Sequence, residues 1–202
     1  MTQSAIATAA DYADAMLTAR KAKHLLWIIL VLMVCAQIVC FFVARYRVDP
    51  AAVNRATDIL KYITGGIDFL GIVLSIVLCV VLLLLIVIML VGRLIGVSRV
   101  VSAFLWSVVL TVLLFPWQAF LINQTFNSPE LKIPGVLYNW AELAARARAH
   151  PIGAHADILF WGRFVGWPAA TLIILLIIHA NSQRGLRQAL GEIPPKPFPR
   201  TQ

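Results

Sequence analysis

Arg163 is the residue of this chain that is best suited to chemistry, because it lies about five residues inside a long apolar run, 158–180. A charged side chain within a bilayer costs a few kcal/mol and by default marks a function. Trp161 and Trp167 of the same run, and Trp117 and Gln118 of the preceding run, are expected at a similar depth. Such a pocket would suit a lipid headgroup, a quinone or a small anionic solute.

A structural ion pair is the other interpretation of Arg163, and it is the one that we favour. Asp68 begins a second apolar run at about the same depth as Arg163, and Asp157 is a further partner. The long arginine side chain can also extend outward to the headgroup region. The aromatic residues nearby would then form an interfacial belt.

His24 and His179 are the candidates for a haem site. They stand at one end of the first and the last apolar run, so they are expected at the same depth, where two histidines could ligate a haem iron axially. Both lie at the rim and outside the apolar interior that usually shelters a haem. We therefore interpret them as polar end markers and predict no cofactor and no metal.

Catalytic motifs are missing from the sequence. It contains no H-E-x-x-H, no G-x-S-x-G and no glycine-rich phosphate loop. A pump or coupled transporter would usually carry acidic residues or histidines deep within its spans, and the apolar runs lack them. We therefore expect a protein that is not an enzyme.

The composition identifies the surroundings of the chain. Of its 202 residues, 61% are hydrophobic and only 13% are charged, about half the charged share of a soluble domain. The net charge of +8 is compatible with nucleic-acid binding. The basic residues, however, stand at the ends of apolar runs, as membrane topology requires. We therefore expect membrane lipids as partners and no nucleic acid.

Four apolar runs predict an all-α integral membrane protein with four transmembrane helices. A span needs about 20 apolar residues, and the runs 25–44, 69–91, 100–122 and 158–180 meet that length. The first run is too long for a cleaved signal peptide, and acidic residues precede it. Residues 1–24 are predicted to form a cytoplasmic helix that leads into the first span. Residues 181–202 read as a basic, proline-rich cytoplasmic tail.

Two short amphipathic helices are predicted between the spans on the outer side. The first covers residues 53–63, after the capping pair Asp49-Pro50 and before Gly65-Gly66. The second follows Pro134-Gly135 and ends at His150-Pro151. They are expected to lie at the headgroup level, or else to pack together as a cap over the bundle.

Lys and Arg near the span ends predict the orientation. Of the 17 basic residues, nine lie on the side of the termini and seven on the other, with Arg163 left out as intramembrane. This bias favours both termini in the cytoplasm. The expected location is the inner membrane of a bacterium.

Small residues at every fourth position predict where helices pack closely. The second run contains Gly71 and Ser75, and the fourth contains Gly162, Gly166 and Ala170. We expect packing within the bundle at these positions, although an oligomerisation face remains the alternative.

The sequence therefore favours a non-catalytic membrane protein that serves as an accessory or structural subunit of a larger complex, in contact with other subunits or with itself. Two alternatives stay open. One is a binding or transport module for a lipid, quinone or small anion centred on Arg163. The other is a haem-binding electron-transfer subunit that uses His24 and His179.

Overall fold

The computed structural model describes residues 2–47, 54–115, 136–138, 140–148 and 154–194. Its regular elements are all helical: α1 (Thr2–Tyr46), α2 (Arg55–Val91), α3 (Val97–Leu114), α5 (Trp140–Arg146), α6 (Ala154–Trp161), η1 (Gly162–Gly166) and α7 (Trp167–Ala189). Four stretches are long and apolar enough to cross a membrane: 12–46, 55–91, 97–114 and 157–189. These helices confirm the all-α bundle and suggest a multi-pass membrane protein.

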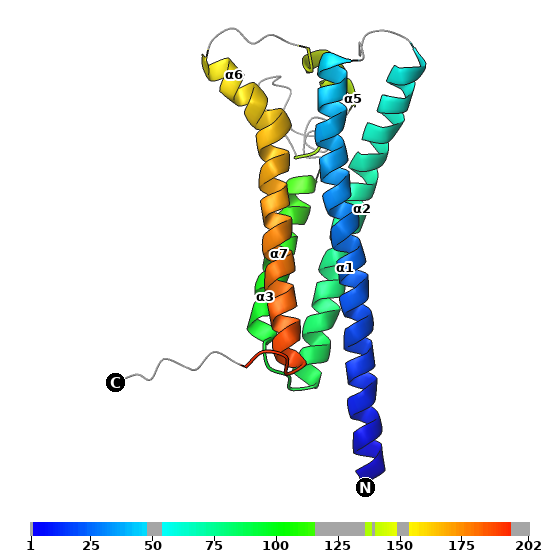
Figure 1. The fold of residues 1–202 in the computed structure, drawn as a ribbon, viewed down its shortest axis with the longest axis vertical. Helices are drawn as coiled ribbons and strands as arrows, with labels where there is room; N and C mark the ends of the chain where they lie inside the picture. The colour runs from blue at the N-terminus through cyan, green and yellow to red at the C-terminus, as the bar shows by residue number, and fades with distance from the viewer. Residues whose placement is uncertain (1, 48–53, 116–135, 139, 149–153, 195–202) are drawn as a thin grey trace, which may run out of the picture.

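The four long helices form a bundle in which neighbours in space follow the order α1, α2, α3, α7 and back to α1. We call the end that carries the start of α1, the end of α7 and the α2–α3 turn the inner end, and the opposite end the outer end (Figure 1). The apolar core joins all four helices through fully buried side chains, among them Leu30, Leu78, Leu110 and Leu175. Toward the outer end the helices splay apart, and α5 lies between them (Figure 1).

Helix α2 is longer than the sequence predicted. Asn54 caps it by accepting from the Thr57 amide, and the Thr57 hydroxyl lies 3.1 Å from the Asn54 amide, which completes a capping box. The helix then runs without interruption through Gly65 and Gly66 to Val91. The separate amphipathic helix predicted over 53–63 is therefore the first part of α2, because glycine weakens a helix without ending it. The capping pair predicted at Asp49-Pro50 lies outside the described residues.

Helix α3 is shorter than predicted. It ends at Leu114, and Phe115 has extended backbone angles of φ −65° and ψ 135°. Pro116 explains this end, since a proline disfavours the helical conformation of the residue before it. The predicted span runs to residue 122, whereas α3 has 18 residues and is about 27 Å long. Residues 116–122 lie outside the described part.

A wider turn interrupts the fourth span. Gly162–Gly166 form a π-helical segment, closed by a hydrogen bond from the Trp167 amide to the Gly162 carbonyl. Pro168 follows directly, and its ring has no amide hydrogen and clashes with the carbonyl four residues earlier. A π turn relieves that clash without ending the helix. The segment places Phe164 in the interior and Arg163 at a partly buried position.

Glycines bring helices together at the inner end. Gly96 begins α3 with φ +96°, a conformation that favours glycine. A Cβ on Gly96 would lie 2.6 Å from the Gly185 carbonyl oxygen, and a Cβ on Gly185 would lie 2.6 Å from Val100 Cγ2. The backbones of α3 and α7 therefore touch, and no larger side chain fits between them.

The small residues that were predicted to mark close packing differ in their surroundings. Gly71 and Ser75 are buried, and a Cβ on Gly71 would lie 2.9 Å from Leu137 Cδ1. A Cβ on Gly162 would meet no described atom within 4 Å, and one on Gly166 would meet only the Trp161 carbonyl of the same helix, at 3.8 Å. Ala170 is half-buried. Cβ atoms at Gly162 and Gly166 would therefore meet no other helix within the described chain.

Candidate functional site

The candidate site is built around a segment that enters the splayed outer end. We call residues 136–138 and 140–147 the outer insert. Val136 donates from its amide to the Leu113 carbonyl at 2.9 Å, so the insert starts against the end of the short helix α3. Tyr138, Leu143 and Ala147 are fully buried. The insert thus occupies space that a longer α3 would have filled, and the second amphipathic helix predicted at the headgroup level packs as a cap inside the bundle.

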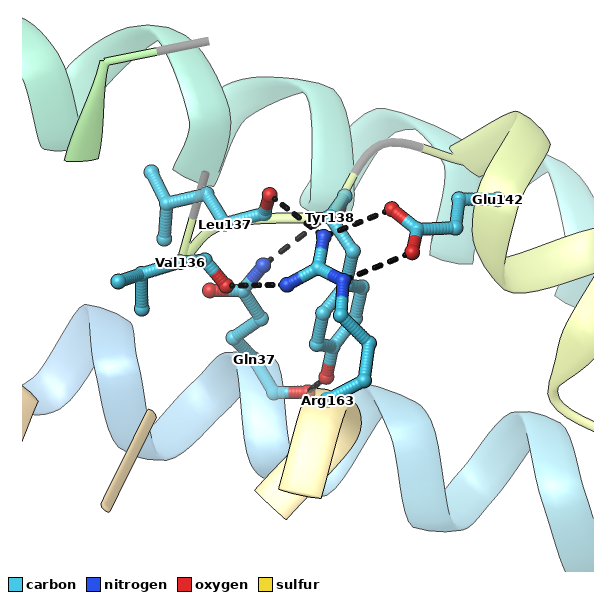
Figure 2. Close-up of polar contacts among 6 residues, drawn as sticks. All are labelled: Gln37, Val136, Leu137, Tyr138, Glu142 and Arg163. Atoms are coloured by element: carbon cyan, nitrogen blue, oxygen red, sulfur yellow. Dashed lines mark hydrogen bonds and ion pairs between the residues drawn. The ribbon is translucent and has the colours of Figure 1, made fainter. Parts of the chain in front are cut away.

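Arg163 binds the outer insert through a carboxylate (Figure 2). Its Nε donates to Glu142 Oε1 at 2.8 Å, and its Nη2 donates to Glu142 Oε2 at 2.8 Å. Each of the two side chains is only about 10% exposed. This two-pronged geometry is the strongest form of arginine–carboxylate contact. The pair therefore joins η1 to α5 through buried charges.

The same guanidinium also binds the backbone of the insert. Nη1 donates to the Val136 carbonyl at 3.2 Å and Nη2 to the Leu137 carbonyl at 3.3 Å. The guanidinium carbon lies 5.9 Å from the centre of the Tyr138 ring. Carbonyls that would be unsatisfied in an apolar interior thus obtain donors from Arg163.

Tyr138 connects the insert to α1. Its hydroxyl donates to the Gln37 carbonyl, and the Gln37 side-chain amide donates to the Tyr138 carbonyl at 3.5 Å (Figure 2). Burial raises the pKa of the Tyr138 phenol well above its ordinary value, and the positive charge of Arg163 opposes that rise in part. The phenol therefore stays protonated and acts as a donor at neutral pH.

Arg45 closes the other side of the insert. It donates to the Ala147 carbonyl at 3.1 Å. Its guanidinium carbon lies 4.9 Å from the centre of the Phe160 ring and 5.1 Å from the Trp161 ring, within the range of cation–π contacts. Arg148, which follows the insert, donates from its Nε to the Ala44 carbonyl of α1 at 3.4 Å.

The structure does not assemble the predicted pocket from its described members. Arg163 turns inward to the insert, whereas Trp161 faces Arg45 and Trp167 is 45% exposed. Trp117 and Gln118 lie outside the described residues. The arginine that was to hold a headgroup or an anion is instead occupied by the carboxylate and two carbonyls of its own chain.

The predicted ion pair between Asp68 and Arg163 is replaced by one between Glu142 and Arg163. The prediction assumed that Asp68 and Arg163 lie at equal depth in neighbouring spans. It could not foresee that the segment carrying Glu142 folds back toward Arg163. One signal was present in the sequence: Glu142 is the only acidic residue between Glu130 and Asp157. Asp68 remains nearby, and its carboxylate interacts electrostatically with Arg163 and Glu142.

His24 and His179 do lie side by side at the inner end, with ring centres 5.5 Å apart and planes inclined by 46°. The Trp27 ring packs 4.2 Å from His179 and donates its indole N–H to the Leu175 carbonyl. The buried Lys23 donates to the Ser182 hydroxyl at 2.9 Å in the same layer. These contacts tie α1 to α7, and the haem interpretation remains an untested prediction. Among the described residues, no group of three His, Cys, Asp or Glu side chains is placed to hold a metal ion.

Comparison with known proteins adds no family to this geometry. No family model, no curated protein and no solved structure matches the chain.

Proposed function

We propose that this chain is a non-catalytic, multi-pass membrane protein that acts as an accessory or structural subunit of a larger membrane complex. The observation that carries the proposal is the use of Arg163. A binding or transport arginine offers its N–H groups to a ligand, whereas four hydrogen bonds from this guanidinium end on Glu142, Val136 and Leu137 of the same chain. The charge that the sequence marks as functional thus has an architectural task.

The outer half of the fourth span offers a surface for a partner helix. Gly162 has an open Cβ position and Gly166 meets only its own helix, and the nearby Ile158 and Leu159 are 69% and 73% exposed. Glycines spaced by four allow another transmembrane helix to approach closely. We propose that a second copy of the chain or another subunit packs there.

The orientation forms part of the proposal. Helix α1 begins and helix α7 ends at the inner end of the bundle (Figure 1), as an even number of spans requires. The basic residues near the span ends favour this side as the cytoplasmic one. We therefore propose a bacterial inner membrane with both termini in the cytoplasm.

Native mass determination after extraction in a mild detergent tests the subunit role. The expected result is a particle heavier than one chain, composed of several copies or of the chain with other membrane proteins. A lone monomer with bound detergent and lipid only would contradict the proposal.

A pair of matched variants tests the surface. Gly162→Leu with Gly166→Leu fills the proposed contact and is expected to reduce the assembled fraction at least tenfold. Gly65→Leu with Gly66→Leu is the control, because Cβ atoms at those two positions also meet no described atom within 4 Å. Equal assembly of both variants would exclude the Gly162–Gly166 surface while leaving the subunit role open.

A further inference from the structure

Two buried oxygen atoms at the outer end have no hydrogen-bond donor within the described chain: Gln37 Oε1 and Asp68 Oδ1. Gln37 is fully buried. A buried acceptor without a donor costs about 1–3 kcal/mol, so native structures seldom leave one unexplained. Two such atoms in one region indicate that a donor belongs there which the hydrogen bonds described so far do not supply.

Rotating the Gln37 amide does not remove the problem. Its Nε2 donates to the Tyr138 carbonyl at 3.5 Å. Exchanging nitrogen and oxygen would place two acceptor oxygens against each other at that distance. The orientation is therefore fixed, and Oε1 of Gln37 remains the atom in need of a donor.

Helix register places the two oxygens in one layer. A Cβ on Gly71 would lie 4.0 Å from Met33 Cε, and α1 and α2 run in opposite directions (Figure 1). One helical turn outward from this contact stand Asp68 on α2 and Gln37 on α1. Tyr138 is their common neighbour, because its hydroxyl bonds to the Gln37 carbonyl and its ring interacts electrostatically with Asp68.

Arg163, Glu142 and Asp68 belong to this layer. Both oxygens of Glu142 accept from Arg163, and Asp68 interacts electrostatically with Arg163, Glu142 and Tyr138 among the described residues. An ionised carboxylate oxygen that is buried without a donor is expensive, and Oδ1 of Asp68 has no donor within the described chain. Asp68 and Gln37 therefore each present one buried acceptor that needs a donor.

A single proton supplies the donor that this pair of acceptors needs. A metal cation needs about six oxygen ligands, and the described residues hold no group of three acidic, histidine or cysteine side chains suited to one. A proton needs one carboxylate oxygen and turns the acid into a donor. A neutral Asp68 can donate to Gln37 Oε1, which satisfies the amide and leaves no ionised carboxylate at Asp68 beside Glu142.

We propose that Asp68 is a proton-binding site that controls how firmly the outer insert is held. In the protonated state the Asp68 hydroxyl donates to Gln37, and Arg163 is left entirely to Glu142. When the Asp68 O–H bond breaks and the proton passes to solvent, the new carboxylate competes with Glu142 for the Arg163 N–H groups. The outer insert then loses part of its attachment. This inference goes beyond the proposed subunit role and does not depend on it.

Infrared spectroscopy of the purified protein in detergent tests the protonated state directly. The expected result at neutral pH is the C=O stretch of a protonated carboxylic acid, which shifts when aspartate is labelled with carbon-13 and disappears in Asp68→Asn. Asp58→Asn is the matched control, because Asp58 is an exposed aspartate on the same helix and its removal leaves the band in place. Absence of a labelled acid band from the wild-type protein would overturn the proposal even if the Asp68 variant failed to fold.

Hydrogen–deuterium exchange tests the control of the insert. After correction for the intrinsic pH dependence of exchange, protection of residues 136–147 is expected to fall by up to tenfold per pH unit as Asp68 loses its proton. Asp58→Asn should behave like the wild-type protein, and Asp68→Asn, a neutral mimic of the acid, should keep its protection at every pH. The same loss of protection in Asp68→Asn as in the wild-type protein would overturn the proposal.

Discussion

The two ends of the bundle are closed by different means. At the inner end α2 and α3 are joined by a short turn, and Gly96 and Gly185 bring the backbones of α3 and α7 into contact. At the outer end the helices splay apart, and the outer insert fills the space between them (Figure 1). Glycines thus bring α3 and α7 together at the inner end, whereas an inserted segment held by two arginines fills the outer end.

This difference follows from the length of α3. The inner ends of α2, α3 and α7 meet, so direct packing satisfies them. At the outer end α3 stops at Leu114, before Pro116, and the chain that fills the gap is partly irregular. Backbone carbonyls in an apolar interior need donors, and Arg163 and Arg45 supply them to Val136, Leu137 and Ala147. The arginines are therefore a consequence of the inserted backbone.

Removing the arginine should have the largest effect. Arg163→Met strands the buried Glu142 carboxylate and two carbonyls, and breaking a buried pair from one side costs about 3–5 kcal/mol. The free energy of unfolding in a mild detergent, measured by denaturant titration, is expected to fall by about that amount.

Two further variants sharpen this prediction. Glu142→Met combined with Arg163→Met should recover much of the loss, because neither member of the ion pair is then left buried without the other. Arg184→Met changes an exposed arginine of α7 and should leave stability nearly unchanged. If Arg163→Met were no more destabilising than Arg184→Met, the insert would not depend on the guanidinium.

At the inner end, the stability of the α3–α7 contact should depend on side-chain volume. A Cβ at Gly185 would lie 2.6 Å from Val100 Cγ2 and 3.0 Å from the Gly96 carbonyl oxygen. Gly185→Ala is therefore expected to cost about 1–3 kcal/mol through overpacking, seen as a lower melting temperature in the same detergent.

Gly65→Ala is the matched control for the inner-end variant. It adds the same methyl group where no described atom lies within 4 Å, so it should lower stability by no more than about 0.5 kcal/mol. Equal melting temperatures for Gly185→Ala and Gly65→Ala would show that the α3–α7 contact is looser than the structure indicates.

The inner end was only partly predictable from the sequence, although its signals are local. Long apolar runs identified the four spans, because span length depends on composition alone. Gly96 and Gly185, however, did not enter the packing prediction, which rested on positions such as Gly162 and Gly166. Which glycine faces a neighbour depends on helix rotation, and the π turn before Pro168 changes that rotation.

The outer end was harder to predict because it depends on contacts distant in sequence. Arg163 was recognised as unusual, and a structural ion pair was favoured over a pocket. Its partner Glu142 lies in a connection that the sequence suggested should rest at the surface. Burial of Leu143 in α5 and of Ala147 just after it depends on the space between the splayed helices, and no periodicity within the connection encodes that space.

The smallest effect expected at the outer end concerns Tyr138. Tyr138→Phe removes one hydrogen bond to the Gln37 carbonyl and should cost about 1 kcal/mol at pH 8. Burial raises the pKa of the folded-state phenol, whereas the unfolded phenol ionises near pH 10. The stability that this difference represents is complete below about pH 10 and is lost as the pH rises further, because only the unfolded state then releases the proton.

The wild-type protein should therefore lose stability faster than Tyr138→Phe in alkaline solution, by about 1.4 kcal/mol for each pH unit above 10. Lysines and the other tyrosines titrate alike in both proteins and cancel in the comparison. Because the wild-type protein starts about 1 kcal/mol ahead, the two stability curves, measured by denaturant titration, should cross near pH 11. Parallel curves without a crossing would mean that the phenol is reached by water and that the outer insert is held less tightly than the inner end.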